Sequence, residues 1–345
     1  MPISTALIAC ANGLGHVRRV MLIADELNEA GFEVTVFAPS QSAKRIKTSL
    51  QLETKFSVKH FDTCTSIMTL RDGDLRALNW EQRLPDISSF DLVVSDNLPE
   101  ILAIRPDAWL SGNFLWHEVL PGISKSYHQR ANSLLETYKP KMLTYGGFST
   151  IDNIKNLRIT ECAIPNPIIN QSGVPRDSLL ITCGTGGEAE SAFRDFVKSL
   201  TKDAIKPFSQ VFVEPSLVPQ DCKSWMHPAR FTANMFCKTL VAICRPGFGI
   251  LSDCLLHKIR MITVFEKGNH EMVRNAAFLE SAGLGEKFND LNAGLFVACQ
   301  YASDPRLQEM QATCSTHFLE RKYPKVSDVL LGLTSSNLNI SYRSA

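Results

Sequence analysis

The sequence predicts an α/β protein with two doubly wound domains, each a parallel sheet covered by helices. Short apolar runs alternate with stretches of helical periodicity from the start of the chain. The alternation begins again after Pro165-Asn166-Pro167, and both series open with a strand and a glycine-rich turn. A chain of 345 residues is also too long for one typical core. We therefore predict domains at residues 1–164 and 165–322, and a tail at 323–345 that could return to the first domain.

The first series of elements follows from apolar runs, helical periodicity and turn residues. Strands are predicted at residues 6–10, 33–37 and 90–96, a turn at 12–15 and an amphipathic helix at 17–30. The strand–helix–strand unit should have a right-handed crossover. The charged stretch 63–86 is irregular, and we expect a long surface excursion there, which is the usual place for variable recognition.

The second series repeats the same logic. Strands are predicted at 178–183, 210–213, 240–244 and 260–265, with helices between them, the first of which reaches about residue 200. Glycine-rich turns follow the first and third of these strands. Ligands of such folds bind at the carboxyl ends of the strands. With two domains, we expect the ligand site in a cleft between them.

Bulk composition excludes several classes of protein. Lys plus Arg (36) nearly balances Asp plus Glu (35), so the chain has no global field for nucleic acid or an anionic membrane. Its ten cysteines are scattered without a CxxC pair, which indicates reduced thiols. The N-terminus enters a strand rather than a signal peptide, and no apolar run has transmembrane length. We therefore expect a cytoplasmic protein without nucleic-acid partners.

Three motifs resemble those of GT-B-fold glycosyltransferases. They are the turn Gly13-Leu14-Gly15-His16-Val17-Arg18-Arg19, the run from Cys244 to Asp253 and the block from Gly268 to Ala277. The resemblance is to family 28, the peptidoglycan N-acetylglucosaminyltransferase group, and to the UDP-glycosyltransferase superfamily. It implies two Rossmann-like domains that face each other across a cleft, with the acceptor on the first domain and the nucleotide-sugar donor on the second.

Two further resemblances touch the first domain. The Gly13–Arg19 turn is similar to the GxGHxxR turn of the nucleotide-sugar hydrolases of pseudaminic acid synthesis. Val94-Ser95-Asp96, followed by residues 112–116, resembles the N-terminal half of plant arabinokinase. These resemblances support the fold more strongly than the reaction.

His16 is the predicted catalytic base. In the resembling transferases a histidine at this position deprotonates the acceptor hydroxyl, and a positioned base contributes about 10²–10⁴-fold to the rate. Asp96 ends a predicted strand of the same domain, where its carboxylate could accept a hydrogen bond from the imidazole and fix its tautomer. The alternatives are a helix-capping or turn role for His16 and an N-cap role for Asp96.

The predicted donor site lies in the second domain. It comprises Gly184, Thr185, Gly186, Gly187, Arg245, Gly247, Phe248, Gly249, Asp253, Asn269, His270 and Glu271. Backbone N–H groups at a helix start would stabilise the charge that develops on the leaving diphosphate. The resemblance gives Asp253 the role of binding the ribose hydroxyls, although family 28 has Glu there. Many UDP-glycosyltransferases carry Asp-Gln where this chain has residues 269–271, so the sugar stays open.

Four residues of the first domain complete the predicted substrate contacts. Gly13 and Gly15 would let the backbone approach a ligand closely, or form an ordinary tight turn. Arg18, or its neighbour Arg19, could reach a phosphate. Trp116 could stack on an acceptor sugar or pack between the domains.

Together these residues predict an inverting glycosyltransferase of the hexosyltransferase type. It would move a sugar from a nucleotide-diphosphate donor, with UDP-sugar expected, to a hydroxyl on a small-molecule, glycan or lipid-linked acceptor. The nucleotide sugar is a co-substrate, and we expect no cofactor and no metal. The alternatives are a nucleotide-sugar hydrolase in which His16 activates water, and a non-catalytic nucleotide-sugar-binding relative. Peripheral membrane contact through residues 114–116 and the oligomeric state stay open.

Overall fold

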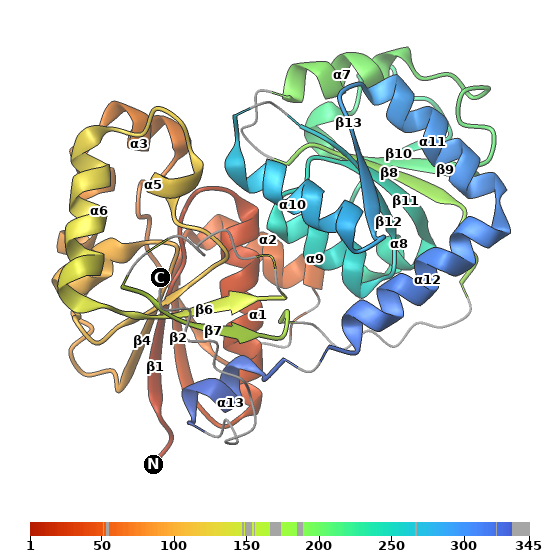
Figure 1. Ribbon diagram of the computed structural model, residues 1–345. Coiled ribbons are helices and arrows are strands. Elements are labelled where there is room, and N and C mark those ends of the chain that lie inside the picture. Colours follow the sequence, from red (N-terminus) through yellow and green to blue (C-terminus); the bar gives the residue numbers. More distant parts are fainter. Residues whose placement is uncertain are drawn as a thin grey trace. The chain divides into compact units, whose positions relative to one another are not determined.

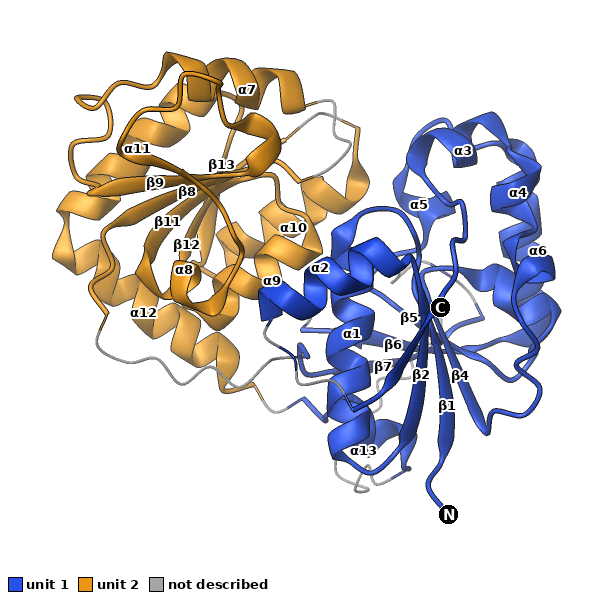
Figure 2. Cartoon of the chain, turned by 180° about the vertical axis from the view of Figure 1, so that it is seen from behind, with its two compact units in different colours: residues 1–167, 322–345 blue, residues 168–321 orange. Residues whose placement is uncertain are grey.

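The computed structural model describes most of the chain. The described residues are 1–50, 52, 55–146, 148, 154, 156–165, 174–184, 189–265, 268–321 and 323–332. The predicted site residues Thr185, Gly186 and Gly187 lie outside this part, and so do Asn166 and Pro167 of the predicted linker. The chain divides into two compact units, which Figure 2 colours separately. The first unit holds residues 1–167 and 322–345, and the second unit holds residues 168–321.

A seven-stranded parallel sheet forms the centre of the first unit, in the order β3-β2-β1-β4-β5-β6-β7 (Figure 1). Its strands are β1 (Ser4–Ile8), β2 (Glu33–Ala38), β3 (Ser57–His60), β4 (Leu92–Asp96), β5 (Trp109–Ser111), β6 (Lys141–Tyr145) and β7 (Arg158–Cys162). Four of the five residues of β1 and of β4 are buried, as expected for strands inside a parallel sheet.

The helices of the first unit surround this sheet. They are α1 (Leu14–Glu29), α2 (Ser40–Leu50), α3 (Ile67–Asp72), α4 (Leu75–Leu78), η1 (Trp80–Arg83), η2 (Pro99–Ala103), α5 (Trp116–Val119), α6 (Lys125–Tyr138) and α13 (Val326–Leu330). Although α13 comes from the far end of the chain, it packs on α1 and β7. The N–H of Ser327 donates to Glu26 Oε1 at 2.8 Å, and the N–H of Ala163 donates to the carbonyl of Pro324 at 2.8 Å.

The second unit contains a six-stranded parallel sheet in the order β10-β9-β8-β11-β12-β13. Its strands are β8 (Ser178–Thr182), β9 (Gln210–Val213), β10 (Met226–Pro228), β11 (Thr239–Cys244), β12 (Arg260–Val264) and β13 (Gly285–Phe288). Its helices are α7 (Glu190–Ser199), η3 (Pro215–Leu217), α8 (Ala233–Lys238), α9 (Phe248–Leu256), α10 (His270–Ser281), α11 (Leu291–Ser303) and α12 (Pro305–Leu319). All five residues of β8 are buried, and α11 covers β11 and β12.

Both sheets have the same topological feature. In the first unit the chain runs outward from β1 through β2 to β3 and then returns to the other side of β1 as β4. In the second unit it runs from β8 through β9 to β10 and returns beside β8 as β11. Ligands of doubly wound folds bind at such switch points, at the carboxyl ends of the strands. The fold therefore predicts ligand sites at the segments that follow β1 and β4 in the first unit, and β8 and β11 in the second.

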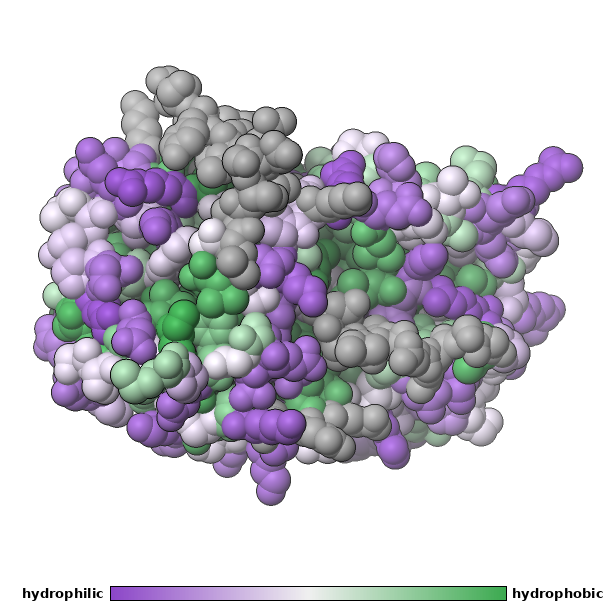
Figure 3. Space-filling view, turned by 90° about the horizontal axis from the view of Figure 1, so that it is seen from below, coloured by the Kyte–Doolittle hydropathy of each residue, from purple (hydrophilic) through white to green (hydrophobic). Residues whose placement is uncertain are grey.

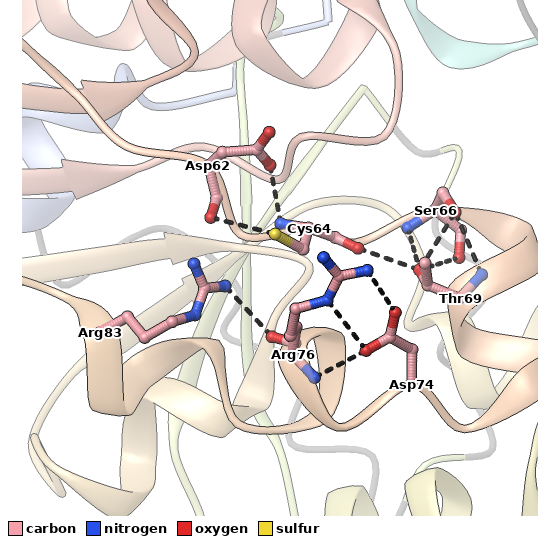
Figure 4. A network of polar contacts seen from close by, with 7 residues as sticks. All are labelled: Asp62, Cys64, Ser66, Thr69, Asp74, Arg76 and Arg83. Carbon is pink, nitrogen blue, oxygen red and sulfur yellow. Dashed lines mark hydrogen bonds and ion pairs between the residues drawn. The ribbon is translucent and has the colours of Figure 1, made fainter.

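The stretch 63–86 differs from the predicted irregular excursion, because it forms α3, α4 and η1. Leu70, Ala77 and Trp80 are fully buried there. Figure 4 shows the polar network that fixes these short helices. Ser66 and Thr69 form a capping box at the start of α3, and Thr69 also donates to the carbonyl of Cys64 at 3.0 Å. The prediction that this stretch is irregular was wrong, because local capping and buried apolar side chains order the segment, whereas its variable recognition role stays a prediction.

The surface is mixed in polarity. On the face that Figure 3 shows, the most prominent residues are hydrophilic, and hydrophobic residues are visible mainly between them. Among the described residues, no helix is both long and apolar enough to cross a membrane.

Candidate active site

His16 and Asp96, which are 80 positions apart in the sequence, meet at the switch point of the first unit. Helix α1 begins at Leu14, three residues earlier than predicted, because Gly13 ends the preceding turn with a φ of +82°. This start places His16 in the first turn of α1, and Asp96 is the last residue of β4. The Nδ1 atom of His16 lies 2.7 Å from Asp96 Oδ2.

Two groups compete for His16 Nδ1, the Asp96 carboxylate at 2.7 Å and Arg19 Nη2 at 3.2 Å, and the shorter contact favours the tautomer that donates to Asp96. An imidazole nitrogen can approach a carboxylate oxygen to 2.7 Å only with a proton between them, so His16 Nδ1 carries the hydrogen and donates it. The other ring nitrogen, Nε2, is then an acceptor when the ring is neutral. Geometrically, this is the arrangement of a histidine base that is oriented by an aspartate.

Arg19 completes a buried polar cluster with His16 and Asp96. Its side chain is 5% exposed and that of Asp96 is 1% exposed, so both charges lie inside the protein. Arg19 Nε donates to Asp96 Oδ1 at 2.7 Å, and Arg19 Nη2 lies 2.6 Å from the same oxygen. The two carboxylate oxygens are therefore divided between Arg19 and His16. Because its guanidinium binds Asp96, Arg19 is poorly placed to bind the phosphate that the sequence suggested for Arg18 or Arg19.

Asn97, the residue after Asp96, is a further hydrogen-bond partner of this cluster. Asn97 has a φ of +57°, and its side-chain Oδ1 accepts from Arg19 Nη2 at 3.3 Å. Gly112, which follows β5, has a φ of +136°, and a Cβ atom there would lie 1.5 Å from Asn97 Oδ1. Glycine is thus required at this position for both conformation and space.

Aromatic side chains border His16. Its ring centroid lies 5.3 Å from that of Trp116 and 6.0 Å from that of Phe114. Trp116 is 4% exposed and belongs to the apolar core cluster of the first unit. Trp116 therefore packs inside the first unit, and its burial does not favour stacking on an acceptor sugar. His117 is also buried, and desolvation lowers the pKa of its imidazole to about 4, so the ring is neutral at pH 7.

The other predicted contacts of the first unit lie close to His16 in the chain. Gly13 caps α1, and Gly15 is an exposed residue in its first turn. Arg18 is half-buried on α1. These positions agree with a turn next to the His16–Asp96 pair, and the ligand contacts of all three residues stay predictions.

Two of the predicted donor turns lie side by side at the switch point of the second unit. Gly184 follows β8 with a φ of +70° and is exposed. Arg245 follows β11, and its backbone N–H donates to the carbonyl of Thr182 at 3.1 Å. Gly247 is the N-cap of α9, where Phe248 and Gly249 form the first turn. Since β8 and β11 are parallel neighbours, Gly184 and Arg245 lie at the same edge of the sheet.

The start of α10 belongs to this edge as well. Asn269 caps α10 by accepting from the N–H of Met272 at 3.3 Å, while His270 is exposed and Glu271 is buried. The side-chain amide of Asn275 donates to the carbonyl of Pro246 at 2.8 Å and so ties α10 to the α9 turn. Asp253 lies further along α9, past its first turn, and is 5% exposed.

Sequence reasoning missed Glu214, which follows β9 directly. Its Oε2 atom accepts three hydrogen bonds from the end of β8, and the N–H of Gly184 is one of the donors, at 2.8 Å. The N–H of Gly184 is therefore engaged by a carboxylate of the protein, which differs from the predicted contact of this N–H with the donor. The position of an acid immediately after a strand was the signal that could have identified it.

A metal site finds no support in the part of the chain that the structure describes. There, no three His, Cys, Asp or Glu side chains are grouped so that they could hold a metal ion.

Comparison with known proteins identifies the fold. No family model matches the chain, and no curated protein sequence matches it. Among solved structures it is similar to CalG4, the calicheamicin glycosyltransferase, with a TM-score of 0.61 and 16% identity over 96% of this chain and 98% of that chain. It is also similar to the Streptomyces sp. SF2575 glycosyltransferase SsfS6 complexed with thymidine diphosphate, with a TM-score of 0.60 and 13% identity over 96% and 99%.

A third similar structure is the spinosyn rhamnosyltransferase SpnG complexed with spinosyn aglycone, with a TM-score of 0.61 and 13% identity over 95% of this chain and 99% of that chain. In all three comparisons nearly the whole of both chains is covered. The chain therefore has the two-domain α/β fold of these glycosyltransferases, the GT-B fold.

Proposed function

We propose that this protein is an inverting glycosyltransferase that uses a nucleotide-diphosphate sugar and a hydroxyl acceptor. The observation that carries the proposal is the His16–Asp96 pair, with 2.7 Å between Nδ1 and Oδ2, at the switch point of the first unit. The fold shared with CalG4, SsfS6 and SpnG supports the reaction class. A nucleotide-binding edge on the second unit and a base on the first supply the two parts that the reaction needs.

In the proposed reaction, His16 Nε2 accepts the proton of the acceptor hydroxyl while the hydroxyl oxygen attacks the anomeric carbon of the donor sugar. The bond from that carbon to the diphosphate oxygen breaks, and the diphosphate leaves from the opposite face, which inverts the configuration. Asp96 accepts the Nδ1 hydrogen throughout and stabilises the imidazolium that forms. Arg19 balances the charge of the carboxylate before the proton moves.

The second unit would bind the donor. The starts of α9 and α10 present backbone N–H groups at the sheet edge that also carries Gly184. Helix N-termini favour anions, and donors that are already oriented stabilise charge as it develops on the leaving diphosphate. We propose uracil as the base of the donor, as the resemblance to the UDP-glycosyltransferase superfamily implies. Because SsfS6 was solved with thymidine diphosphate, both pyrimidine nucleotides belong in the test.

The test has a binding stage and a turnover stage. Calorimetric titration with UDP and TDP measures nucleotide binding, and a panel of UDP- and TDP-sugars with phenolic, polyketide and sugar acceptors measures transfer. We expect nucleoside diphosphate release that depends on the acceptor, together with a glycosylated product of inverted configuration. His16→Ala should abolish transfer and retain nucleotide binding, whereas His317→Ala, which changes an exposed histidine of α12, should retain both.

Two results would contradict the proposal. Release of free sugar at the same rate with and without acceptor would identify a hydrolase, in which His16 activates water. Nucleotide binding without turnover, unchanged by His16→Ala, would identify a non-catalytic binding protein.

A further inference from the structure

Three hydrogen-bond donors at the end of β8 converge on one carboxylate oxygen. Glu214 Oε2 accepts from Thr182 Oγ1 at 2.8 Å, from the N–H of Cys183 at 2.9 Å and from the N–H of Gly184 at 2.8 Å. Glu214 follows β9, the strand beside β8, and is 7% exposed. This carboxylate is thus the acceptor for both described N–H groups that follow β8, those of Cys183 and Gly184.

Such a group of donors is an anion site that the protein occupies itself. Successive backbone N–H groups in a turn form a concavity that binds anions, and a hydroxyl group adds a third donor here. Hydrogen bonds to an ionised acceptor are about twice as strong as those between neutral groups. Since Glu214 occupies these donors, Cys183 and Gly184 contribute their conformation to the site rather than their N–H groups.

The same carboxylate indirectly fixes the second turn of this edge. Thr182 binds Glu214 through its hydroxyl, and its carbonyl accepts the N–H of Arg245 at 3.1 Å. Arg245 is followed by Gly247, the residue that caps α9. Glu214 therefore anchors the end of β8, and Thr182, which it binds, is also the residue whose backbone pairs with the start of the turn after β11.

We propose that Glu214 is a positioning residue of the nucleotide site. It does not touch the donor, but it fixes the backbone at Gly184, after β8, and through Thr182 the backbone at Arg245, after β11. This inference rests on the proposed function in one respect, that the second unit binds the nucleotide. It assigns a role to a residue outside the three sequence motifs.

The experiment compares Glu214→Gln with Glu214→Asp and with the control Glu309→Gln, which removes an exposed carboxylate of the same unit. Glutamine keeps the shape and one acceptor oxygen but loses the charge, whereas aspartate keeps the charge. For Glu214→Gln we expect the Kd for UDP or TDP and the donor KM to rise about tenfold or more, with the acceptor KM within about twofold of wild type. Glu214→Asp should recover part of the loss, and Glu309→Gln should behave as wild type.

The direction of the change in affinity discriminates between two roles of the carboxylate. If Glu214 merely competed with the diphosphate for the donors, its replacement by glutamine would tighten nucleotide binding. Unchanged or tighter binding by Glu214→Gln, in protein with an unaltered melting temperature, would therefore overturn the proposal. Equal losses of donor and acceptor affinity would also overturn it, because they would indicate general damage to the fold.

A second readout is independent of any ligand. Hydrogen exchange measured on the peptide that covers residues 178–184 should be faster in Glu214→Gln than in wild type or Glu309→Gln, because the oxygen that accepts from the N–H groups of Cys183 and Gly184 loses its charge and the two hydrogen bonds weaken. Exchange at the wild-type rate would show that Glu214 does not hold the turn. If the wild-type protein binds no nucleotide, the proposed function fails, and this measurement still decides whether Glu214 anchors the turn.

Discussion

His16 and Asp96 lie 2.7 Å apart, between Nδ1 and Oδ2, and the second carboxylate oxygen of Asp96 is bound by Arg19. Asp96→Asn replaces the acceptor by an amide, which can offer an N–H to Nδ1 and so favour the wrong tautomer, with the hydrogen on Nε2. We expect kcat to fall by about 10²–10⁴-fold, because Nε2 would no longer accept the proton of the acceptor hydroxyl. Steady-state kinetics with saturating donor would measure this loss.

Nucleotide binding supplies the control for Asp96→Asn. The variant changes the first unit, and we propose that the donor binds to the second, so the Kd for UDP or TDP should stay within about twofold of wild type. A wild-type kcat in a variant that binds nucleotide normally would exclude Asp96 from the reaction. A parallel loss of kcat and of nucleotide affinity would point instead to damage of the fold.

Arg19 should matter for both stability and turnover. Arg19→Met leaves the carboxylate of Asp96 buried without its cationic partner, which typically costs about 3–5 kcal/mol of unfolding free energy. Arg19→Lys keeps the charge but loses the planar fork that reaches Asp96 and Asn97 together, so we expect an intermediate stability and a reduced kcat. Urea denaturation and steady-state kinetics would measure both effects.

Arg306→Met is the matched control for Arg19, because Arg306 is an exposed arginine on α12. Its replacement should change the free energy of unfolding by less than about 0.5 kcal/mol. If Arg19→Met were as stable as Arg306→Met, the ion pair with Asp96 would not be a structural element of the site.

Gly112→Ala tests whether the position of Asn97 matters for the cluster of His16, Asp96 and Arg19. A methyl group there would lie 1.5 Å from Asn97 Oδ1 and 2.7 Å from Asn97 Cγ, at a φ of +136°. Asn97 must move, and its contact with Arg19 must change with it. We expect a loss of about 1–3 kcal/mol from backbone strain alone, and a lower kcat.

The stability control for Gly112→Ala is Gly15→Ala. Gly15 is inside α1, and no atom lies within 4 Å of a Cβ built there, so alanine should raise stability by up to about 1 kcal/mol. Thermal denaturation of the two variants should therefore shift in opposite directions. A shift in the same direction would contradict the steric argument for Gly112.

The sequence allowed the main features of the fold to be predicted because the central strands are long apolar runs. The predicted strand 178–183 is observed at Ser178–Thr182, and 260–265 at Arg260–Val264. The short strand Trp109–Ser111 gives no comparable signal in the sequence, because three residues cannot show a periodicity. The helices between residues 63 and 86 were missed because their order comes from side-chain caps and burial, which leave a weak pattern in the sequence.

The candidate site was predictable where local motifs carry it and hidden where distant residues meet. The glycine-rich turn identified His16, and a strand end identified Asp96. The binding of Arg19 to Asp96 depends on the pairing of β1 with β4, and the contacts of Glu214 depend on the pairing of β8 with β9. No spacing in the sequence encodes these pairings, so the sequence alone identifies neither the binding of Arg19 to Asp96 nor the contacts of Glu214.

Glu100 should make stability depend on pH. Its carboxyl group is buried on η2, Trp80 Nε1 donates to its Oε2 at 3.3 Å, and burial raises its pKa from 4.5 to about 7. Between these two values the folded protein holds a proton that the unfolded chain has released, so this group lowers the free energy of unfolding as the pH rises from 4.5 to 7. The loss is complete above pH 7 and amounts to about 3 kcal/mol. Glu100→Gln removes this penalty, so relative to wild type it should be more stable at pH 8 than at pH 5, by about 2.5 kcal/mol in urea denaturation, because wild type has already lost a small part at pH 5. Glu136→Gln, an exposed change on α6, should show no such pH-dependent difference, and an equal effect of Glu100→Gln at both pH values would contradict the titration of Glu100 in this range.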